Sequence, residues 1–332
     1  MNAESSGAGR VSVFFPIMPV KPETIVGFAE LVRDAGLARL WMGQSLTYDA
    51  YHLFAYLAGR GLRIPTGTAV TVMGLRHPYE AAVQARSVAL FTGRPMTVGF
   101  GPGSPEMVAS LRGRRFASPL TASREYLSMV RSLVNGEPVR RSGEYHFLEG
   151  ALPAMPAGEP EIRVGAGVLR SGMARVAGEV ADAAITWLTP LPYIQEVLAP
   201  ALREGAQSRG RPTPAVVSMV HFAVDRPGVD PLAMVLAANR DHLGTEHYTA
   251  MLRSAGLAAD PSDPEAGAKG LVDSGVFLTG SAEEIAKRVA EHLRGGVDEV
   301  VLSPGGVLLT RGVEAALADL RDVVAELERL GG

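Results

Sequence analysis

Short apolar runs alternate with helix-type patterns along most of the chain. Most of these runs are apolar throughout rather than alternating, which is typical of parallel strands buried on both faces. The candidate strands are Val11–Pro16, Arg39–Gly43, Gly67–Met73, Met96–Gly101, Glu161–Gly167, Ala183–Leu188, Ala215–Val224 and Glu299–Pro304.

Helical patterns lie between the candidate strands. Ser281 and Glu284 form a capping box, and Ile285, Val289 and Leu293 follow at helical spacing. This alternation, repeated eight times, predicts an α/β fold, a (β/α)8 TIM barrel. An open doubly wound sheet is the alternative, but it rarely needs eight strands.

Two segments are longer than ordinary connections and predict insertions after strands 4 and 7. Gly103–Gly150 holds a loop and a helix over Thr121–Asn135. Pro227–Val276 holds a helix near Pro231–Leu243 and a stretch, Ala258–Gly270, rich in Pro, Gly, Ala and Asp. Long insertions are usually lids, binding loops or disordered links. We expect residues 1–10 to be a flexible tail and residues 11–332 to form one domain.

Composition excludes several kinds of chemistry. The 332 residues include no cysteine, which excludes disulfides, thiolate nucleophiles and Cys-based metal sites. The seven histidines show no metal-ligand spacing, so we expect no metal. The net charge of −3 predicts neither a nucleic-acid nor a membrane partner. The polar first residues do not resemble a signal peptide, and we expect a cytoplasmic protein.

Three strand-to-helix junctions carry the candidate chemistry, because catalytic groups of barrels lie where strands end. At the first, Gly99, Gly101 and Gly103 end a strand. Glycine permits close approach of the backbone to a ligand and unusual dihedral angles. The motif is therefore either a floor under a flat cofactor or a tight turn.

A second junction resembles an anion site. Gly165-Ala166-Gly167 precedes Arg170-Ser171-Gly172, and a helix is expected to begin near Ser171. Free N–H groups, a hydroxyl and Arg170 would hold a phosphate there, although Ser171 could simply cap the helix. The segment is not a dinucleotide-binding fingerprint, because a third glycine and the acidic residue after the next strand are missing.

The third junction is Arg76-His77-Pro78, in which Pro78 suits the first turn of a helix over Tyr79–Phe91. His77 would then either cap this helix or transfer a proton. No nucleophile elbow or triad is evident. A bound cofactor therefore carries the chemistry in our interpretation.

Several blocks, in order, resemble the luciferase-like monooxygenase superfamily of flavin- and deazaflavin-dependent oxidoreductases. The blocks are Gly67–Thr71 with Arg76-His77-Pro78, Gly93-Arg94 with Val98–Gly101, Leu133–Val139 with Gly143-Glu144-Tyr145, Val176–Asp182, and Gly280–Ile285 with Gly296-Val297-Asp298.

The resemblance implies a TIM barrel, usually dimeric, with the cofactor ring at the carboxyl ends of the strands. It also implies a supporting bulge in the third strand, here around Thr71-Val72-Met73, and a lining segment, Gly101–Ser104. The expected ring and ribityl site is Val72, Met73, Gly101, Gly103, Ala166 and Gly167. Arg170, Ser171 and Gly172 match the phosphate region.

One departure from the family pattern narrows the activity. Members that oxidise sugar phosphates or alcohols commonly carry Asp-His after the second strand, where this chain reads Trp41–Ser45. Gln44 cannot act as a base. The resemblance then favours hydride delivery to an activated double bond, or oxygenation, over proton abstraction from an alcohol.

These considerations give one principal hypothesis and two alternatives. The first is a coenzyme F420-dependent reductase acting on an activated C=C or C=N of a natural-product precursor, possibly a dehydroamino acid, as a small molecule or peptide. The alternatives are an FMN-dependent monooxygenase supplied by a partner reductase and a non-catalytic cofactor-binding barrel. A homodimer and a flavin or F420 reductase partner are expected. The candidates for the substrate side are Gln44, Tyr48, His77, Trp187 and His221.

Overall fold

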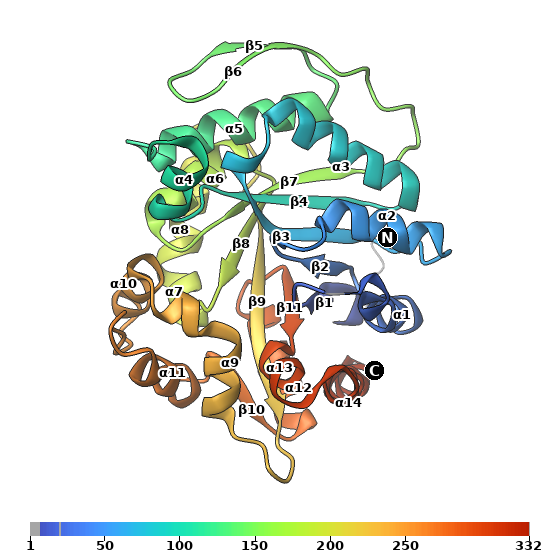
Figure 1. Cartoon of the computed structure of the whole chain (residues 1–332), viewed down its shortest axis with the longest axis vertical. Helices are drawn as coiled ribbons and strands as arrows, with labels where there is room; N and C mark the ends of the chain where they lie inside the picture. The colour runs from blue at the N-terminus through green and yellow to red at the C-terminus, as the bar shows by residue number, and fades with distance from the viewer. Residues whose placement is uncertain (1–6, 20, 332) are drawn as a thin grey trace. The chain divides into compact units, whose positions relative to one another are not determined.

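The structure, a computed structural model, describes residues 7–19 and 21–331 (Figure 1). Each of the eight predicted strands is present, and each end agrees within one residue. These strands are β1 (Val11–Phe15), β2 (Leu40–Met42), β3 (Thr66–Val72), β4 (Met96–Gly101), β7 (Ile162–Gly167), β8 (Ala183–Trp187), β9 (Ala215–Val224) and β11 (Glu299–Ser303).

The sheet contains one strand more than the sequence predicted. The strand β10 (Phe277–Gly280) pairs in parallel with β9, with Phe277 opposite His221. The strand order is β10-β9-β11-β1-β2-β3-β4-β7-β8, and β9 also pairs with β8, which makes the fold a closed parallel TIM barrel with an extra strand. The short β10 follows a helix directly, so its four residues lack a distinct apolar run.

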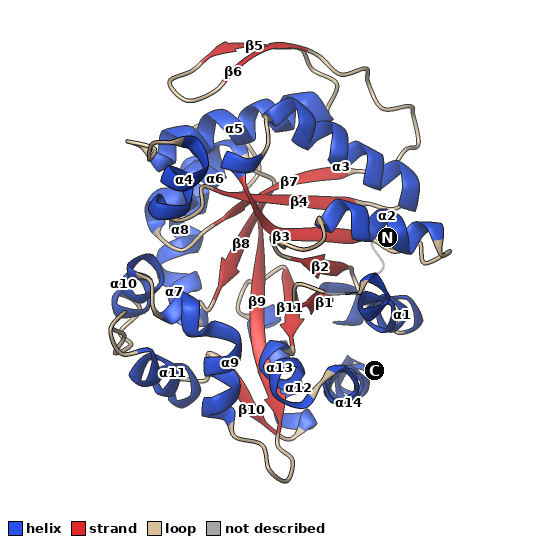
Figure 2. Cartoon of the chain, viewed as in Figure 1, coloured by secondary structure: helices blue, strands red, loops and turns tan. Residues whose placement is uncertain are grey.

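Helices follow the strands along the chain (Figure 2). They are α1 (Val26–Asp34), α2 (Ala50–Gly59), α3 (Pro78–Thr92), α4 (Pro105–Arg112), α5 (Pro119–Val134), α6 (Ser171–Val180), α7 (Leu191–Tyr193), α8 (Ala199–Gln207), α9 (Pro231–Leu243), α10 (Glu246–Ser254), α11 (Pro264–Asp273), α12 (Ala282–Arg294), α13 (Gly305–Arg311) and α14 (Val313–Gly331). The predicted capping box of Ser281 and Glu284 begins α12.

Both predicted insertions contain regular structure. Between β4 and β7 lie α4, α5 and an antiparallel hairpin of β5 (Val139–Ser142) and β6 (Phe147–Gly150), which the sequence patterns did not reveal. Between β9 and β10 lie α9, α10 and α11. The stretch 258–270 is therefore partly helical, because α11 begins at Pro264.

The hairpin turn is held by one carboxylate. The Glu125 side chain in α5 accepts hydrogen bonds from the backbone N–H groups of Glu144, Tyr145 and His146 at 2.8, 3.0 and 3.1 Å. A Cβ on Gly143 would lie 2.3 Å from this carboxyl group. The family block around Gly143 is therefore explained by the close approach of the turn to Glu125.

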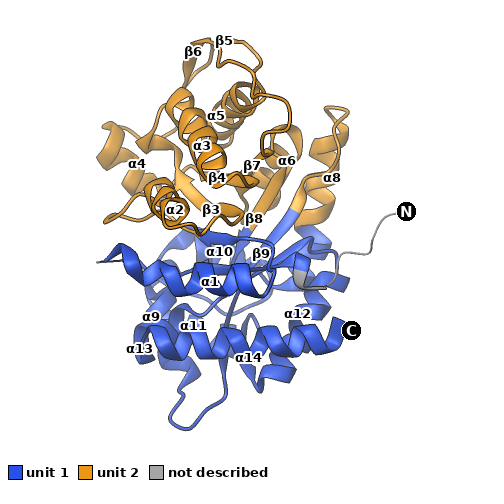
Figure 3. Cartoon of the chain, turned by 90° about the vertical axis from the view of Figure 1, so that its right-hand side faces the viewer, with its two compact units in different colours: residues 1–41, 186–197, 216–332 blue, residues 42–185, 198–215 orange. Residues whose placement is uncertain are grey.

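The chain divides into two compact units (Figure 3). Unit 1 consists of residues 1–41, 186–197 and 216–332, and unit 2 of residues 42–185 and 198–215. The expectation of one domain over residues 11–332 stays a prediction.

In unit 1, a carboxylate at the start of β11 ties three segments together. Glu299 accepts hydrogen bonds from Ser12 Oγ at 2.5 Å, Trp41 Nε1 at 2.7 Å and Arg39 Nε at 3.0 Å. Residues 7–10, which belong to the expected flexible tail, form a 3₁₀ helix, and Arg10 donates to the carbonyl of Val297 at 2.6 Å. Residues 1–6 lie outside the described residues.

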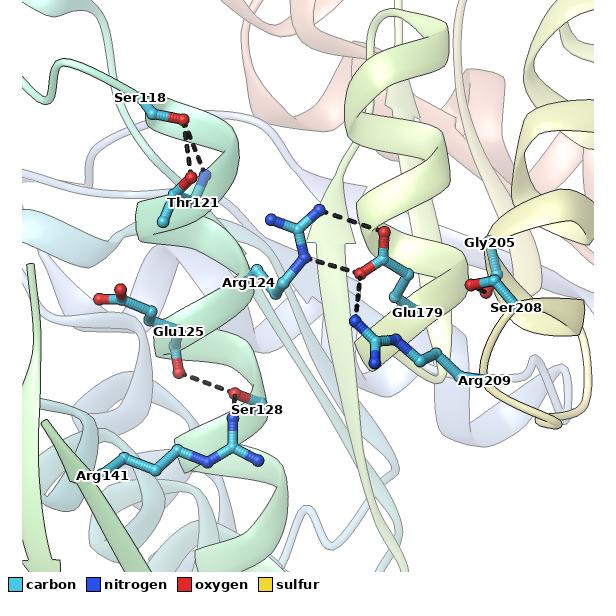
Figure 4. A network of polar contacts seen from close by, with 10 residues as sticks. All are labelled: Ser118, Thr121, Arg124, Glu125, Ser128, Arg141, Glu179, Gly205, Ser208 and Arg209. Carbon is cyan, nitrogen blue, oxygen red and sulfur yellow. Dashed lines mark hydrogen bonds and ion pairs between the residues drawn. The ribbon is translucent and has the colours of Figure 1, made fainter. Parts of the chain in front are cut away.

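In unit 2, ion pairs and glycine contacts join α5, α6 and α8. Glu179 accepts a bidentate hydrogen bond from Arg124 at 2.6 and 3.1 Å and lies 3.5 Å from Arg209 (Figure 4). A Cβ on Gly178 would lie 2.3 Å from the carbonyl oxygen of Leu202. The family block Val176–Asp182 therefore serves helix packing in this chain.

Candidate active site

A bulge in β3 organises the candidate cofactor region of unit 2. The β3–β4 register shifts between Thr68 and Thr71, and Val70 has a φ of 114°, which is unusual for a β-branched residue. The resemblance placed this irregularity around Thr71-Val72-Met73, so that expectation is corrected by one to three residues. Thr68 stabilises the bulge, because its Oγ1 accepts from Gly99 N at 2.8 Å.

The glycines at the ends of β4 and β7 make room for this bulge and for the interior. A Cβ on Gly167 would lie 2.8 Å from Val70 Cγ1, and one on Gly101 would lie 3.7 Å from Val70. Cβ atoms on Gly99 and Gly165 would lie 2.5 and 2.8 Å from Ile185 Cδ1. Packing therefore explains Gly99 and Gly165, and a role as a cofactor floor stays a prediction for Gly101.

The remaining ring candidates surround the end of β3. Val72 donates its backbone N–H to Gln44 Oε1 at 3.3 Å, and Gln44 Nε2 donates to the carbonyl of Ser45 at 2.9 Å. Gly103 has a φ of 77°, and a Cβ there would lie 3.1 Å from Val72 Cγ1. Met73 and Ala166 are buried. Gln44 and Val72 are thus brought together, with the Gln44 amide fixed in orientation.

The start of α6 has the expected composition of an anion site. The helix begins at Ser171 after Arg170, whose side chain makes no capping hydrogen bond and has no partner among the described residues. Ala174 N bonds to the Arg170 carbonyl at 3.0 Å, and the N–H groups of residues 171–173 have no partner shown among the described residues. By contrast, α2, α3, α4 and α5 each have a capping side chain.

His77 takes the structural role that the sequence left open. Its Nδ1 accepts from Tyr79 N at 3.3 Å at the start of α3, and its Nε2 lies 3.2 Å from the carbonyl oxygen of Phe147 in β6. A neutral ring with its proton on Nε2 satisfies both contacts. Tyr48 is 36% exposed and lies in the segment that precedes α2. The proposed contact of His77 and Tyr48 with substrate stays a prediction.

Unit 2 also holds a buried polar cluster that sequence reasoning missed. Arg76 forms an ion pair with Asp49 and lies over the Tyr51 ring, 5.4 Å from its centroid. Tyr126 and His146 pack edge-on with a centroid distance of 5.3 Å. Burial lowers the pKa of Arg76, raises that of Tyr126, and lowers that of His146 to about 4. Polar residues on the buried face of the predicted helix 121–135 were the available signal.

Unit 1 brings Trp187 and His221 together and adds two unpredicted residues. The ring centroids of Trp187 and His221 are 4.6 Å apart. His242 lies 5.3 Å from Trp187, and Tyr248 lies 4.8 Å from His242. These four residues are called the indole cluster below.

Burial keeps the imidazoles of the indole cluster neutral. Burial, with His242 nearby, lowers the pKa of His221 to about 3. Burial also lowers the pKa of His242 to about 4, against the opposing effect of Asp241. The sequence analysis did not single out His242, which is one of the seven histidines without metal-ligand spacing. Its position three residues after Asn239, on one face of a helix, was the signal for a second polar site.

Metal-ligand groups and membrane-spanning helices are both absent from the described residues. Within residues 7–19 and 21–331, no three His, Cys, Asp or Glu side chains are grouped to hold a metal ion. In the same residues, no helix combines the length and apolar character that crossing a membrane requires.

Known proteins resemble this chain over nearly its full length. The 5,10-methylenetetrahydromethanopterin reductase of Methanolobus tindarius is 26% identical over 309 residues, covering 87% of this chain and 91% of that protein. The solved coenzyme F420-dependent tetrahydromethanopterin reductase of Methanopyrus kandleri has a TM-score of 0.70 and 20% identity, covering 96% of this chain and 99% of that one.

A monooxygenase shares the fold equally well. The structure of the monooxygenase RslO1 of Streptomyces bottropensis has a TM-score of 0.71 and 16% identity, covering 97% of this chain and 100% of that one. The family model described as luciferase-like monooxygenase matches residues 4–299. The chain therefore belongs to the luciferase-like monooxygenase family.

Proposed function

We propose that this protein is a coenzyme F420-dependent oxidoreductase that reduces an activated C=C or C=N. When bound, reduced F420 supplies a hydride. The F420-dependent reductase that shares the fold supports this cofactor, and the reductase relative from Methanolobus supports a reduction. A natural-product precursor, such as a dehydroamino acid, is the proposed substrate.

The observation that carries the proposal is the uncapped start of α6. F420 and FMN both contain a phosphate group, and the free N–H groups of residues 171–173 point out of the helix end. Arg170 and Ser171 are exposed there, and the Arg170 guanidinium has no partner among the described residues. Arg170, Ser171 and Gly172 would therefore hold the phosphate.

The bulged end of β3 is the proposed support for the ring. Val72, Met73, Gly101, Gly103, Ala166 and Gly167 would shape the ring and ribityl site. The Val70 side chain already occupies the space beside Gly167. The contribution of Gly167 is therefore to leave room for Val70. Small and apolar residues at a strand end suit a conjugated ring.

The residues proposed for the substrate side favour reduction over alcohol oxidation. Gln44 is neutral, and both ends of its amide are engaged, with Val72 N and the Ser45 carbonyl. It can orient a polar group but cannot remove a proton. Tyr48, His77, Trp187 and His221 complete the proposed set. A homodimer and an F420 or flavin reductase partner are also proposed.

An FMN-dependent monooxygenase is the second candidate, and its phosphate would use the same α6 site. The fold shared with the Streptomyces monooxygenase favours it. A barrel that binds cofactor without turnover is the third.

Titration of the purified protein with F420 and with FMN, followed by cofactor fluorescence, tests the proposal. Tight binding of F420 alone supports the reductase, and activated alkenes and imines are then assayed. Tight binding of FMN alone supports the monooxygenase, which would consume oxygen with reduced flavin. Binding without turnover on either panel supports the third candidate, and binding of neither cofactor contradicts all three.

A further inference from the structure

We propose that the indole cluster binds an uncharged conjugated carbonyl group of the substrate, with the Trp187 and His221 N–H groups donating to its oxygen. This inference rests on the proposed function, because it names the substrate class of the same reductase. Every residue that it uses lies in unit 1.

The cluster contains an unusual number of buried polar atoms without partners. Trp187 Nε1, both ring nitrogens of His221 and Nδ1 of His242 are buried and have no hydrogen-bond partner within the described part of the chain. An unsatisfied buried polar group costs about 1–3 kcal/mol. Such groups are normally hydrogen-bonded, so several together indicate a site that a ligand or water completes.

His221 is the most buried residue of the cluster. The His221 side chain is 2% exposed, whereas Trp187, His242 and Tyr248 are half-buried. Trp187 and His221 meet edge to face at 84°. A ligand would therefore contact the half-buried aromatic rings with its apolar part and place its polar atom toward His221.

Two neighbouring polar side chains extend the site. Ser303, at the end of β11, is the register partner of His221, so both side chains lie on the same face of the sheet. Asn239 lies three residues before His242, on the same face of α9. Ser303 Oγ and both amide atoms of Asn239 are also buried without partners in the described residues.

The functional groups of the cluster select for an uncharged ligand. Indole N–H is a donor only, and a neutral imidazole has one donor and one acceptor. His242 is the titratable group that acts on His221, and Asp241 and His247 act on His242. Asp241 is acidic, so a buried carboxylate or phosphate would be unpaired and would be strongly disfavoured.

A conjugated carbonyl also suits the proposed reaction. Hydrogen bonds to a carbonyl oxygen stabilise negative charge that develops there when the conjugated double bond is attacked. The acceptor oxygen binds the indole and imidazole donors, while the planar conjugated system contacts Trp187 and Tyr248. The cluster would thus bind the substrate and make it more electrophilic.

The two tryptophans make this proposal testable by fluorescence. Trp41 is fully buried and bonded to Glu299, and Trp187 lies in the cluster. The cofactor-free protein is titrated with 2-methyl-1,4-naphthoquinone, an uncharged conjugated dicarbonyl, and with 1,4-naphthoquinone-2-sulfonate, its anionic counterpart. The absence of cysteine removes the most reactive target of quinones. Affinity is measured in parallel by calorimetry.

We expect saturable quenching in W41F protein, whose emission comes from Trp187, and little saturable quenching in W187F protein. H221F, which keeps the ring shape but removes both nitrogens, should weaken binding of the uncharged quinone about tenfold. The matched control is H52F, since the His52 side chain is 80% exposed in unit 2. The sulfonate should bind at least tenfold more weakly than the uncharged quinone.

The proposal is overturned if the uncharged quinone does not bind, if H221F and W187F leave its affinity unchanged, or if the sulfonate binds as tightly. Circular dichroism verifies that each variant folds. If H221F does not fold, the titration of W41F still tests whether the quinone binds beside Trp187. F420 titrations of the same proteins separate the two hypotheses. If F420 does not bind but the quinone binds as expected, only the proposed function is contradicted. If F420 binds but the quinone does not, only this inference is contradicted.

Discussion

Val70 and Gly167 form a tight contact across the interior of unit 2, where a Cβ on Gly167 would lie 2.8 Å from Val70 Cγ1. Val70 adopts a φ of 114°. A β-branched residue in this conformation persists only where its surroundings fix it. The bulge in β3 and the glycine that ends β7 therefore depend on each other.

We predict that G167A lowers the free energy of unfolding by about 1–3 kcal/mol through overpacking. In the double variant V70A/G167A, the Cγ1 atom is gone, and most of the loss caused by G167A should disappear. Urea unfolding of the four proteins of this double-mutant cycle measures the coupling. Additive effects of the two substitutions would contradict the proposed contact.

The second prediction concerns the phosphate site at the start of α6. R170A should weaken cofactor binding by about 1–3 kcal/mol, the scale of a lost hydrogen bond to a charged group. R175A is the matched control, since it removes the same charge five residues further along the helix, where Arg175 pairs with Glu204. Equal affinities of R170A and the unaltered protein in a fluorescence titration would exclude Arg170 from the site.

The buried imidazoles predict a pH dependence of stability. The pKa of His221 is about 3 in the folded protein, below the ordinary value of 6.5. Between these values the unfolded state binds the additional proton, so stability falls as pH decreases below 6.5, by up to about 1.4 kcal/mol per pH unit for this residue. The free energy of unfolding, measured with urea, should therefore differ less between pH 7 and pH 5 for H221F than for the unaltered protein.

Glu179 predicts a second loss of stability at lower pH. Its hydrogen bonds with Arg124 lower the pKa of this carboxyl group below 4.5. The stabilisation is complete above the unfolded pKa and is lost as pH falls through the folded pKa. E179Q should reduce stability at pH 7 by about 1–2 kcal/mol and flatten the profile below pH 4.5. If the stability of E179Q changes with pH below 4.5 as steeply as that of the unaltered protein, the pair of Glu179 and Arg124 does not contribute to this pH dependence.

The Glu299 contacts predict a loss of stability without a loss of cofactor affinity. E299A removes the acceptor of Trp41 Nε1 and the carboxylate that pairs with Arg39, and both side chains are largely buried. Removal of one partner from such a pair costs about 3 kcal/mol. Thermal unfolding should register this loss, while F420 affinity of the folded fraction stays unchanged. E314A, on an acidic residue in the first turn of α14, is the control.

The sequence by itself determined the alternation of strands and helices in this protein. Apolar runs such as Met96–Gly101 and Ala215–Val224 matched their strands because a strand buried on both faces requires a continuous apolar run. The helix starts at Ser281 and Pro78 followed from local capping chemistry. The family was recognisable because its blocks keep their order along the chain.

Only the tertiary structure decided which residues meet. The bulge at Val70 depends on space left by Gly167, which is far from it in sequence. The hairpin of β5 and β6 depends on Glu125 in another element. His242 joins Trp187 and His221 because helix and strand pack together, and contacts across the fold leave no local pattern in the sequence.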